Sequence, residues 1–429
     1  MHFTFEKITE KNEFYNLLKC TDVNPSGISR FTPSPLVIIL YRYSQVNPKL
    51  HITFSTAPLL SREPYIIATG VAHSPDNWAE APNGSKTTPF DHLTAQQLND
   101  MQLGKAYLLL DQSHEGYHEE WLWPWFHNTC NKYNIPIQQI IYVTGNMNSQ
   151  YQYTDWANKN KLLKDIRMHV FPYAHFELAM ASMIPYSNLP TAKQQYKHKK
   201  QNIKNIKLYD CLQKRPRNHR AWIFCKLYES NLLNSGINTM NEFSYNHAFM
   251  EGRYLNKDVF EKVHNLLPMY PPNDSDSSTY KSEDCGQFLI KYNEDIMLQT
   301  WISVVSEAHF SDVDTNHTVF LSEKTFKPIA CSQPFILYSN KGSLQRLRDL
   351  GYKTFHPYID ETYDTLNTFE RIDAITNELK RLDSLTPKEK LQWLSDIKLI
   401  LDYNRTHLES LASNCSLNIL NYFRRIFNV

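Results

Sequence analysis

The residues best suited to chemistry follow two apolar runs in the C-terminal half of the chain. The run WISVVSE ends at Glu307, and the run FLSEK ends with Ser322, Glu323 and Lys324. Ser322 is a suitable helix N-cap, so Glu323 and Lys324 would lie in a first helical turn, where backbone N–H groups are free. A strand that leads into a helix N-terminus commonly binds phosphate in α/β folds. The pattern therefore predicts a phosphate or nucleotide site, with an ordinary βα turn and an exposed charged pair as the alternative.

A second group of cations follows the strand-like run KLYDCL at 207–212. The segment KRPRNHR that comes after it contains Arg215, Arg217 and Arg220. A guanidinium group binds a phosphate through two parallel hydrogen bonds, which suits these arginines to a phosphorylated ligand. A solvated start of a helix is the alternative interpretation of the same residues.

A third polar segment ends a buried strand in the N-terminal half, AYLLLDQSHEG at 106–116. Its last residues include Asp111, His114 and Glu115, and Gly116 permits a tight turn. The carboxyl ends of the strands in a parallel sheet are where ligands gather. We therefore expect His114 and Glu115 to border a ligand site, with simple capping of the sheet surface as the alternative.

Residues 114–118 also read HEGYH, which matches the H-E-x-x-H pattern of zinc peptidases. That chemistry needs both histidines on one face of a long helix, with Glu115 beside the metal-bound water. Here the pattern directly follows a strand, contains Gly116 and precedes Pro124, and no third ligand lies at a familiar spacing. A zinc metallopeptidase is therefore the less favoured enzyme class, and we predict no metal site.

The order of these motifs resembles that of one known family. Ser306-Glu307, the Ser322-Glu323-Lys324 turn and the apolar strand Pro334-Phe335-Ile336-Leu337 are similar to the donor-binding segment of fucosyltransferase-type glycosyltransferases. The similarity covers roughly an eighth of the chain and extends weakly to the arginine-rich run. Pro328 departs from the family pattern and predicts a short or kinked helix. The whole chain also resembles uncharacterised proteins encoded by phages and giant viruses.

This resemblance implies a GT-B-like fold of two facing Rossmann-like lobes and an inverting transfer from a GDP- or UDP-linked sugar to a hydroxyl acceptor. The acceptor would be a glycan or a hydroxymethylated base of viral DNA. Glu115 would be the general base, with His114 as the alternate. No obligatory cofactor is expected, because cationic side chains would neutralise the leaving diphosphate. The implied donor-binding residues are Arg215, Arg217, Arg220, Glu307, Ser322, Glu323 and Lys324.

Two lobes are needed to position these motifs. Short apolar runs bounded by Pro, Gly, Asn or Asp predict strands in the N-terminal half at 36–41, 51–54, 65–71, 106–111 and 140–144. Because such strands alternate with helix-length segments such as 118–133, we expect an α/β fold with mostly parallel sheets. Further helices are expected from Asn218 and at 343–351, 366–382 and 387–403. The predicted parts are a first lobe at 1–185, a basic linker at 186–206, a donor-binding lobe at 207–385 and a helical tail at 386–429.

The composition restricts the class of protein and its surroundings. The formal net charge of +1 gives no global attraction to nucleic acid or membranes, although the basic run at 193–207 could follow a DNA backbone. The 7 cysteines lack C-x-x-C spacing, and the N-terminus is too charged for a signal peptide. We therefore expect a cytoplasmic protein without a membrane partner, in an infected host cell if the chain is viral. A non-catalytic sugar-binding or structural viral protein is the alternative to an enzyme.

Overall fold

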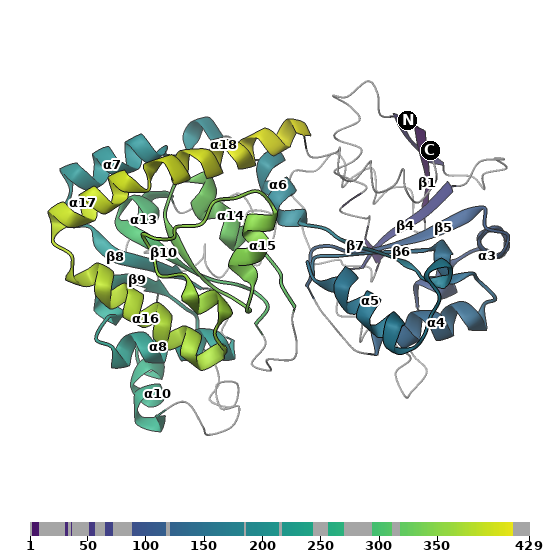
Figure 1. Ribbon diagram of the computed structural model, residues 1–429, viewed down its shortest axis with the longest axis horizontal. Coiled ribbons are helices and arrows are strands. Elements are labelled where there is room, and N and C mark those ends of the chain that lie inside the picture. Colours follow the sequence, from purple (N-terminus) through teal and green to yellow (C-terminus); the bar gives the residue numbers. More distant parts are fainter. Residues whose placement is uncertain are drawn as a thin grey trace. The chain divides into compact units, whose positions relative to one another are not determined.

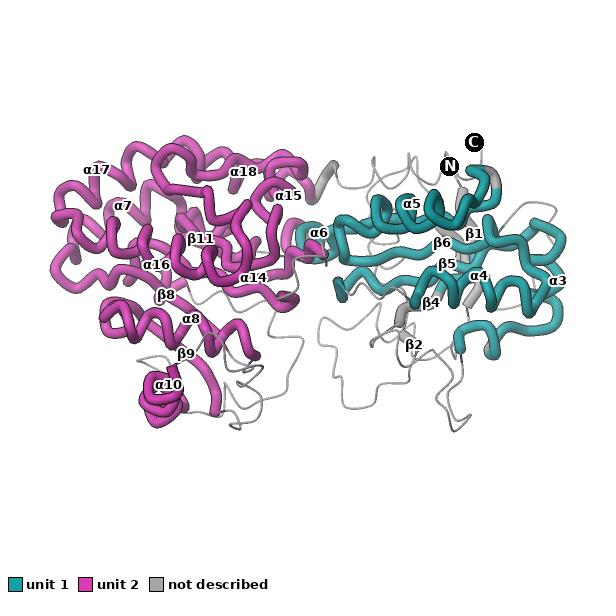
Figure 2. The backbone as a smooth tube through the Cα atoms, turned by 60° about the horizontal axis from the view of Figure 1, so that its bottom comes forward, with its two compact units in different colours: residues 1–179, 284–287, 412–429 teal, residues 180–283, 288–411 magenta. Residues whose placement is uncertain are grey.

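The chain forms two compact units (Figure 2). Unit 1 consists of residues 1–179, 284–287 and 412–429, and unit 2 consists of residues 180–283 and 288–411. Figure 1 shows the helices and strands, coloured along the sequence. The computed structural model describes residues 2–7, 31–32, 36, 51–55, 65–71, 88–116, 121–183, 186–213, 217–242, 256–269, 294–310 and 318–414.

Unit 1 is built on a seven-stranded sheet with the strand order β3-β1-β4-β5-β6-β7, in which β2 also pairs with β4. All neighbouring strands are parallel except β2 and β4. The strands are β1 (His2–Lys7), β2 (Phe31–Thr32), β3 (His51–Ser55), β4 (Tyr65–Val71), β5 (Ala106–Gln112), β6 (Ile140–Thr144) and β7 (His169–Pro172).

Most of the strands predicted for this unit are confirmed. The predictions at 51–54, 65–71, 106–111 and 140–144 agree with β3, β4, β5 and β6 to within one residue. The sequence does not predict β1, whose charged end interrupts the apolar pattern, or β7, which is short and ends in proline. The strand expected at 36–41 lies outside the described residues apart from Leu36.

Aromatic packing supports β6 from one side. Helix α4 (Leu122–Lys132) falls within the predicted helix, and Pro124 is tolerated because it lies in the first turn, where its missing N–H has no helical partner. Trp123 and Phe126 of this helix have ring centroids 6.0 and 5.3 Å from that of Tyr142 in β6. All three rings are almost completely buried. Helices α3 (Ala95–Gln102) and α5 (Ser149–Lys159) complete this part of unit 1.

Unit 2 has a four-stranded parallel sheet in the order β11-β10-β8-β9. Its strands are β8 (Lys207–Leu212), β9 (Gly236–Thr239), β10 (Thr300–Ser306) and β11 (Phe335–Tyr338). Its helices are the end of α6 (His175–Met183), α7 (Ala192–Gln201), α8 (Asn218–Glu229), α10 (Lys257–His264), α13 (Glu294–Leu298), α14 (Glu323–Ala330), α15 (Ser343–Asp349), α16 (Thr368–Ser384), α17 (Pro387–Asp396) and α18 (Lys398–Asn414). Two parallel sheets with intervening helices confirm the predicted α/β class.

The helices predicted for the C-terminal part are confirmed with shifted bounds. The helix at 366–382 is α16, and the helix at 387–403 is divided into α17 and α18 at Ile397. Thr386 caps α17 through a capping box with Glu389, as the Thr386-Pro387 pair suggests. Beyond Asn414 the predicted tail lies outside the described residues.

The segment 186–206, expected to be a basic linker, contains helix α7 and belongs to unit 2. Thr191 caps the helix in a capping box with Gln194. The buried positions of the helix are Ala192, Gln195 and Lys199, spaced three and four residues apart. Two of these three side chains are polar, so hydrophobic periodicity could not reveal the helix.

Among the helices in the described ranges, none is both long enough and apolar enough to span a membrane.

Candidate functional site

In the sheet of unit 2, the direction in which the chain adds successive strands reverses between β8 and β10. These two strands are neighbours, with Ile302 opposite Tyr209. The chain leaves β8 through α8 towards β9 on one side, and it leaves β10 through α14 towards β11 on the other side. In open α/β sheets, ligands bind at such a switch point, beyond the carboxyl ends of the strands. The starts of α8 and α14 are therefore the elements expected to form a site.

The carboxylate of Glu307, directly after β10, holds the start of α14 in place. Its Oε1 atom accepts hydrogen bonds from the Ser322 N–H at 2.9 Å and from the Thr325 hydroxyl at 2.5 Å. Its Oε2 atom accepts from the Ser322 hydroxyl at 2.5 Å and from the Ala308 N–H at 3.1 Å. Glu307 is completely buried. The residue predicted to contact a sugar or base thus has both carboxylate oxygens bound to groups of the protein, most of them at the start of α14.

The first turn of α14 combines a cap, a buried carboxylate and a partly exposed ammonium. Ser322 is the N-cap, as predicted, and its side chain accepts a hydrogen bond from the Lys324 N–H. The Lys324 ammonium lies 2.5 Å from Glu323 Oε1, and its side chain is 22% exposed. Burial alone would raise the pKa of Glu323, but the charges of Lys324 and Lys327 lower it below the ordinary value. Glu323 is therefore ionised, and Lys324 is the cation of this turn that reaches solvent.

Helix α14 is short, in agreement with the prediction from Pro328. It has eight residues and contains Pro328 in its interior. The proline has no N–H to donate to the carbonyl of Lys324, four residues earlier, and this limits the length of the helix.

The start of α8 reaches across to the same point through three side chains. The Arg217 guanidinium donates to the Ala308 carbonyl at 2.5 Å. His219 Nε2 lies 3.0 Å from the Glu307 carbonyl, and the Arg220 guanidinium lies 3.5 Å from it. Because a carbonyl oxygen only accepts, His219 must carry its proton on Nε2. These contacts bring the two helix starts together around residues 307 and 308.

Arg220 is the most buried cation of the group, with 4% of its surface exposed. Burial lowers the pKa of Arg220 to about 10, assisted by Arg217 and opposed by Glu307 and Glu323. The guanidinium therefore stays charged at neutral pH. The structure thus brings together six of the predicted donor-binding residues, and Arg215 lies outside the described residues.

Two residues of this site were not singled out in the sequence. His219 is buried and neutral. Its burial, and secondly the nearby charge of Arg220, hold the pKa of His219 well below the ordinary value. Lys327 lies one helical turn after Glu323, and burial lowers its pKa to about 8 despite the opposing effect of Glu323. The spacing of four residues from Glu323 was the available signal for Lys327, whereas nothing in the local sequence indicates the contact of His219 with residue 307.

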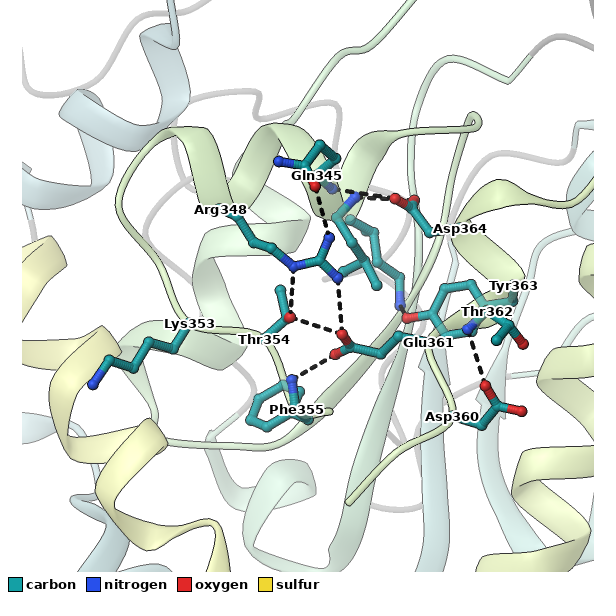
Figure 3. A network of polar contacts seen from close by, with 12 residues as sticks. Gln345, Arg348, Lys353, Thr354, Phe355, Asp360, Glu361, Thr362, Tyr363 and Asp364 are labelled. Carbon is teal, nitrogen blue, oxygen red and sulfur yellow. Dashed lines mark hydrogen bonds and ion pairs between the residues drawn. The ribbon is translucent and has the colours of Figure 1, made fainter. Parts of the chain in front are cut away.

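The third helix start at this edge, that of α15 after β11, is already occupied by a carboxylate. Asp364 accepts hydrogen bonds from the Leu344 N–H at 3.0 Å and from the Gln345 N–H at 3.1 Å (Figure 3). These are N–H groups of the first turn, which a bound anion would otherwise use. The start of α15 therefore has these two N–H groups bound within the fold.

The loop that carries Asp364 is itself fixed by a second carboxylate. Glu361 accepts hydrogen bonds from Arg348 at 3.0 Å, from the Thr354 hydroxyl at 2.7 Å and from the Phe355 N–H at 2.5 Å (Figure 3). Glu361 is 8% exposed. The network joins the end of α15 to the loop after it, and its polar groups are used in holding the fold.

The candidate base lies in unit 1, in the turn after β5. The Glu115 N–H donates to the Gln112 carbonyl at 3.0 Å, and the Glu115 carbonyl accepts from the Gly145 N–H at 2.9 Å. The turn therefore folds over the end of β6. His114 and Glu115 are both half-buried there. This is the position at the carboxyl edge of the sheet that the sequence predicts.

The same turn argues against a zinc peptidase motif. Residues 113–114 form a turn after β5, residues 115–116 belong to no helix or strand, and α4 begins only at Leu122. His114 and Glu115 therefore do not share a helix, as the H-E-x-x-H arrangement requires. Residues 117–118, the rest of the pattern, lie outside the described residues.

Comparisons with known proteins find similar structures but no related sequence. No protein-family model matches the chain, and no curated protein matches it. The structure of an α1,3-fucosyltransferase aligns over 100% of this chain and 90% of its own, at 8% identity and a TM-score of 0.36. A putative UDP-N-acetylglucosamine 2-epimerase from Listeria monocytogenes aligns over 100% and 97%, at 8% identity and a TM-score of 0.40. Anabaena HepE in complex with UDP aligns over 97% and 100%, at 10% identity and a TM-score of 0.37. Similarity at this level assigns neither an activity nor a site residue to this chain.

Proposed function

We propose that this protein is a glycosyltransferase that moves a sugar from a nucleoside diphosphate to a hydroxyl acceptor. One observation carries the proposal: the starts of α8 and α14 meet at the switch point of the unit 2 sheet, together with Arg217, Arg220 and Lys324. Each helix start is equivalent to about half a positive charge. Together, two helix starts and three cations outweigh the carboxylates of Glu307 and Glu323 at the same point, so the site suits a negatively charged group such as a diphosphate.

The same arrangement would serve the leaving group of the transfer. As the bond between the sugar and the diphosphate breaks, negative charge develops on the phosphate oxygens, and fixed cations stabilise it. Lys324 is partly exposed and Arg220 is buried beside the Glu307 carbonyl, so the two cations differ in their access to solvent. We infer that Arg220 fixes the diphosphate and that Lys324 follows the developing charge, without an obligatory metal.

The chemical step would be a direct displacement that inverts the anomeric carbon. Glu115 would take the proton of the acceptor hydroxyl as the oxygen attacks, and the diphosphate would leave with the bonding electrons. The proposed donor is a UDP- or GDP-linked sugar, and the proposed acceptor is a glycan or a hydroxymethylated base of viral DNA. The local support for Glu115 is its place at the carboxyl edge of a parallel sheet.

A thermal-shift panel tests the donor site directly. The full chain is heated with UDP, GDP, CDP or ADP, each with and without EDTA. A ligand at about 100-fold its Kd stabilises the protein by about 2.7 kcal/mol, which raises Tm by a few degrees. We expect one nucleotide to do so in the presence of EDTA. Lys324→Ala removes the proposed hydrogen bonds between the ammonium and the phosphate, so it should weaken the binding of that nucleotide about 10- to 100-fold.

Lys388→Ala is the matched control, because Lys388 is an exposed lysine of α17 in the same unit. It should leave the nucleotide-induced shift unchanged. If none of the four nucleotides raises Tm, the proposed donor site is wrong. Release of UDP or GDP from a panel of sugar nucleotides then separates an enzyme from a protein that only binds sugar nucleotides.

A further inference from the structure

The carboxyl edge of the unit 1 sheet carries buried polar atoms that have no hydrogen-bond partner in the described part of the chain. They are Ser113 Oγ, His114 Nδ1 and His175 Nδ1. Ser113 is completely buried, and both Nδ1 atoms are shielded from solvent. A buried polar atom without a partner costs about 1–3 kcal/mol. Three of them at one edge indicate a place where a bound polar group completes the hydrogen bonding.

Backbone hydrogen bonds bring the two segments that carry these atoms to the same point. The Gly145 N–H, just after β6, donates to the Glu115 carbonyl at 2.9 Å, which draws the turn after β5 over the end of β6. From the other side, the Tyr173 N–H donates to the Thr144 carbonyl at 2.8 Å, and His175 follows two residues later. The ends of β5, β6 and β7 are in register. Ser113, His114 and His175 therefore border the end of one strand.

The charge of this cluster favours a neutral ligand. Asp111 is completely buried beside it, and its carboxylate accepts hydrogen bonds from the Leu36 N–H at 2.7 Å and the Ser113 N–H at 2.9 Å. Burial lowers the pKa of His175 to about 4, although Asp111 opposes the effect and His114 adds to it. His175 is therefore neutral at pH 7. A neutral imidazole beside a buried carboxylate disfavours an anion.

We propose that Ser113, His114 and His175 bind a hydroxyl group of the sugar or other polyhydroxylated acceptor. A hydroxyl both donates and accepts, so it can accept from the Ser113 hydroxyl while it donates to an imidazole nitrogen. Glu115 belongs to the same turn, so a hydroxyl held there is close in sequence and space to the candidate base. The inference rests on the proposed function, because it names the place where the acceptor of that transfer binds.

Saturation-transfer NMR on the full chain without nucleotide tests this binding by itself. The probes are galactose, N-acetylglucosamine and 5-hydroxymethyl-2′-deoxycytidine at up to about 50 mM, a concentration that saturates a millimolar site. We expect at least one probe to bind and Ser113→Ala and His175→Gln to weaken it at least about fivefold, as loss of one hydrogen bond predicts. Both variants should keep the Tm of the parent within a few degrees, which shows that they fold.

Ser332→Ala and His127→Gln are the matched controls. Ser332 is a completely buried serine of unit 2 whose hydroxyl also has no hydrogen-bond partner among the described residues. His127 is a half-buried histidine on α4 beside Tyr153. Both should bind the probe as the parent does. No binding of any probe, or binding that Ser113→Ala and His175→Gln leave unchanged, overturns the inference and leaves ordered water as the occupant.

The outcome is independent of the donor site. If a probe binds in a way that depends on Ser113 but none of the four nucleotides binds, the sugar site is supported and the proposed transferase function is wrong. If a nucleotide binds but no probe binds in a way that depends on Ser113, the donor site is supported and the sugar site is wrong.

Discussion

The carboxylate of Glu307 holds Ser322 by two hydrogen bonds, one of 2.9 Å from its backbone N–H and one of 2.5 Å from its hydroxyl. The two residues lie fifteen positions apart in the chain. Their contact joins the end of β10 to the start of α14, and the helix start carries Lys324. The position of the proposed phosphate-binding cation is therefore determined by a buried carboxylate that has no need to touch the ligand.

Glu307→Gln should weaken both the fold and the nucleotide site. The amide replaces one accepting oxygen with a donor that faces the Ser322 and Thr325 hydroxyls or the backbone N–H groups. Loss of hydrogen bonds to a buried charge predicts a fall of about 2–3 kcal/mol in the free energy of unfolding, measured with urea. Nucleotide affinity should fall about tenfold, because α14 is displaced. Glu370→Gln, an exposed residue in the first turn of α16, is the control, and equal stability of the two variants would contradict the role of Glu307.

Asp364→Asn should affect stability and leave nucleotide binding intact. Asp364 caps α15 by accepting two backbone N–H groups, and a lost helix cap costs about 1 kcal/mol. Urea unfolding measures this loss, and the thermal-shift panel measures binding. Asp349→Asn, at the exposed end of the same helix, should cost less than about 0.5 kcal/mol, since its pairing with Arg346 is at the surface. A loss of nucleotide binding in Asp364→Asn would place the phosphate at α15 instead.

Two adjacent lysines of α7 should behave in opposite ways when each is replaced by alanine. The Lys199 ammonium is completely buried and donates to Gln195, to Gln333 at 2.9 Å and to the Met297 carbonyl at 3.1 Å. Lys199→Ala leaves these acceptors buried without a donor, so the free energy of unfolding should fall by about 2–4 kcal/mol. Lys200 is exposed, and Lys200→Ala should change the free energy of unfolding by less than about 0.5 kcal/mol. Equal values from urea unfolding would show that the buried network contributes no stability.

The same lysine predicts a stability that depends on pH. Burial lowers the pKa of Lys199 to about 7, although Asp210 and Cys331 oppose it, whereas the ordinary value is 10.5. Between these two values the unfolded chain binds a proton that the folded protein has released, so stability rises with pH across this window. From about pH 7 to about pH 9, the free energy of unfolding of the parent should rise by roughly 2 kcal/mol relative to that of Lys199→Met.

Lys200→Met is the control for this experiment, and its difference from the parent should not depend on pH. Burial raises the pKa of Asp210 to about 6, with Thr300, Ser303 and Lys199 opposing it, so its charge change lies below this window. Parallel pH profiles for the parent and Lys199→Met would mean that Lys199 titrates near its ordinary pKa.

Features that depend on neighbours in the chain were predictable. The strands at 65–71 and 207–212 and the N-cap at Ser322 agree with the structure, because an apolar run or a capping side chain is recognised within a few residues. Helix α7 was missed for the opposite reason. Its buried Lys199 is satisfied by Gln333, which lies 134 positions further along the chain.

The candidate site divides in the same way. The sequence by itself determined that cations and a helix N-cap follow two strands of an α/β fold, because residue types and local spacing carry that information. Only the tertiary structure decided that β8 and β10 are neighbours, that His219 reaches Glu307 88 positions away, and that Glu307 is used to hold a helix. The partner of a buried polar group is selected by packing between distant segments, which no local pattern records.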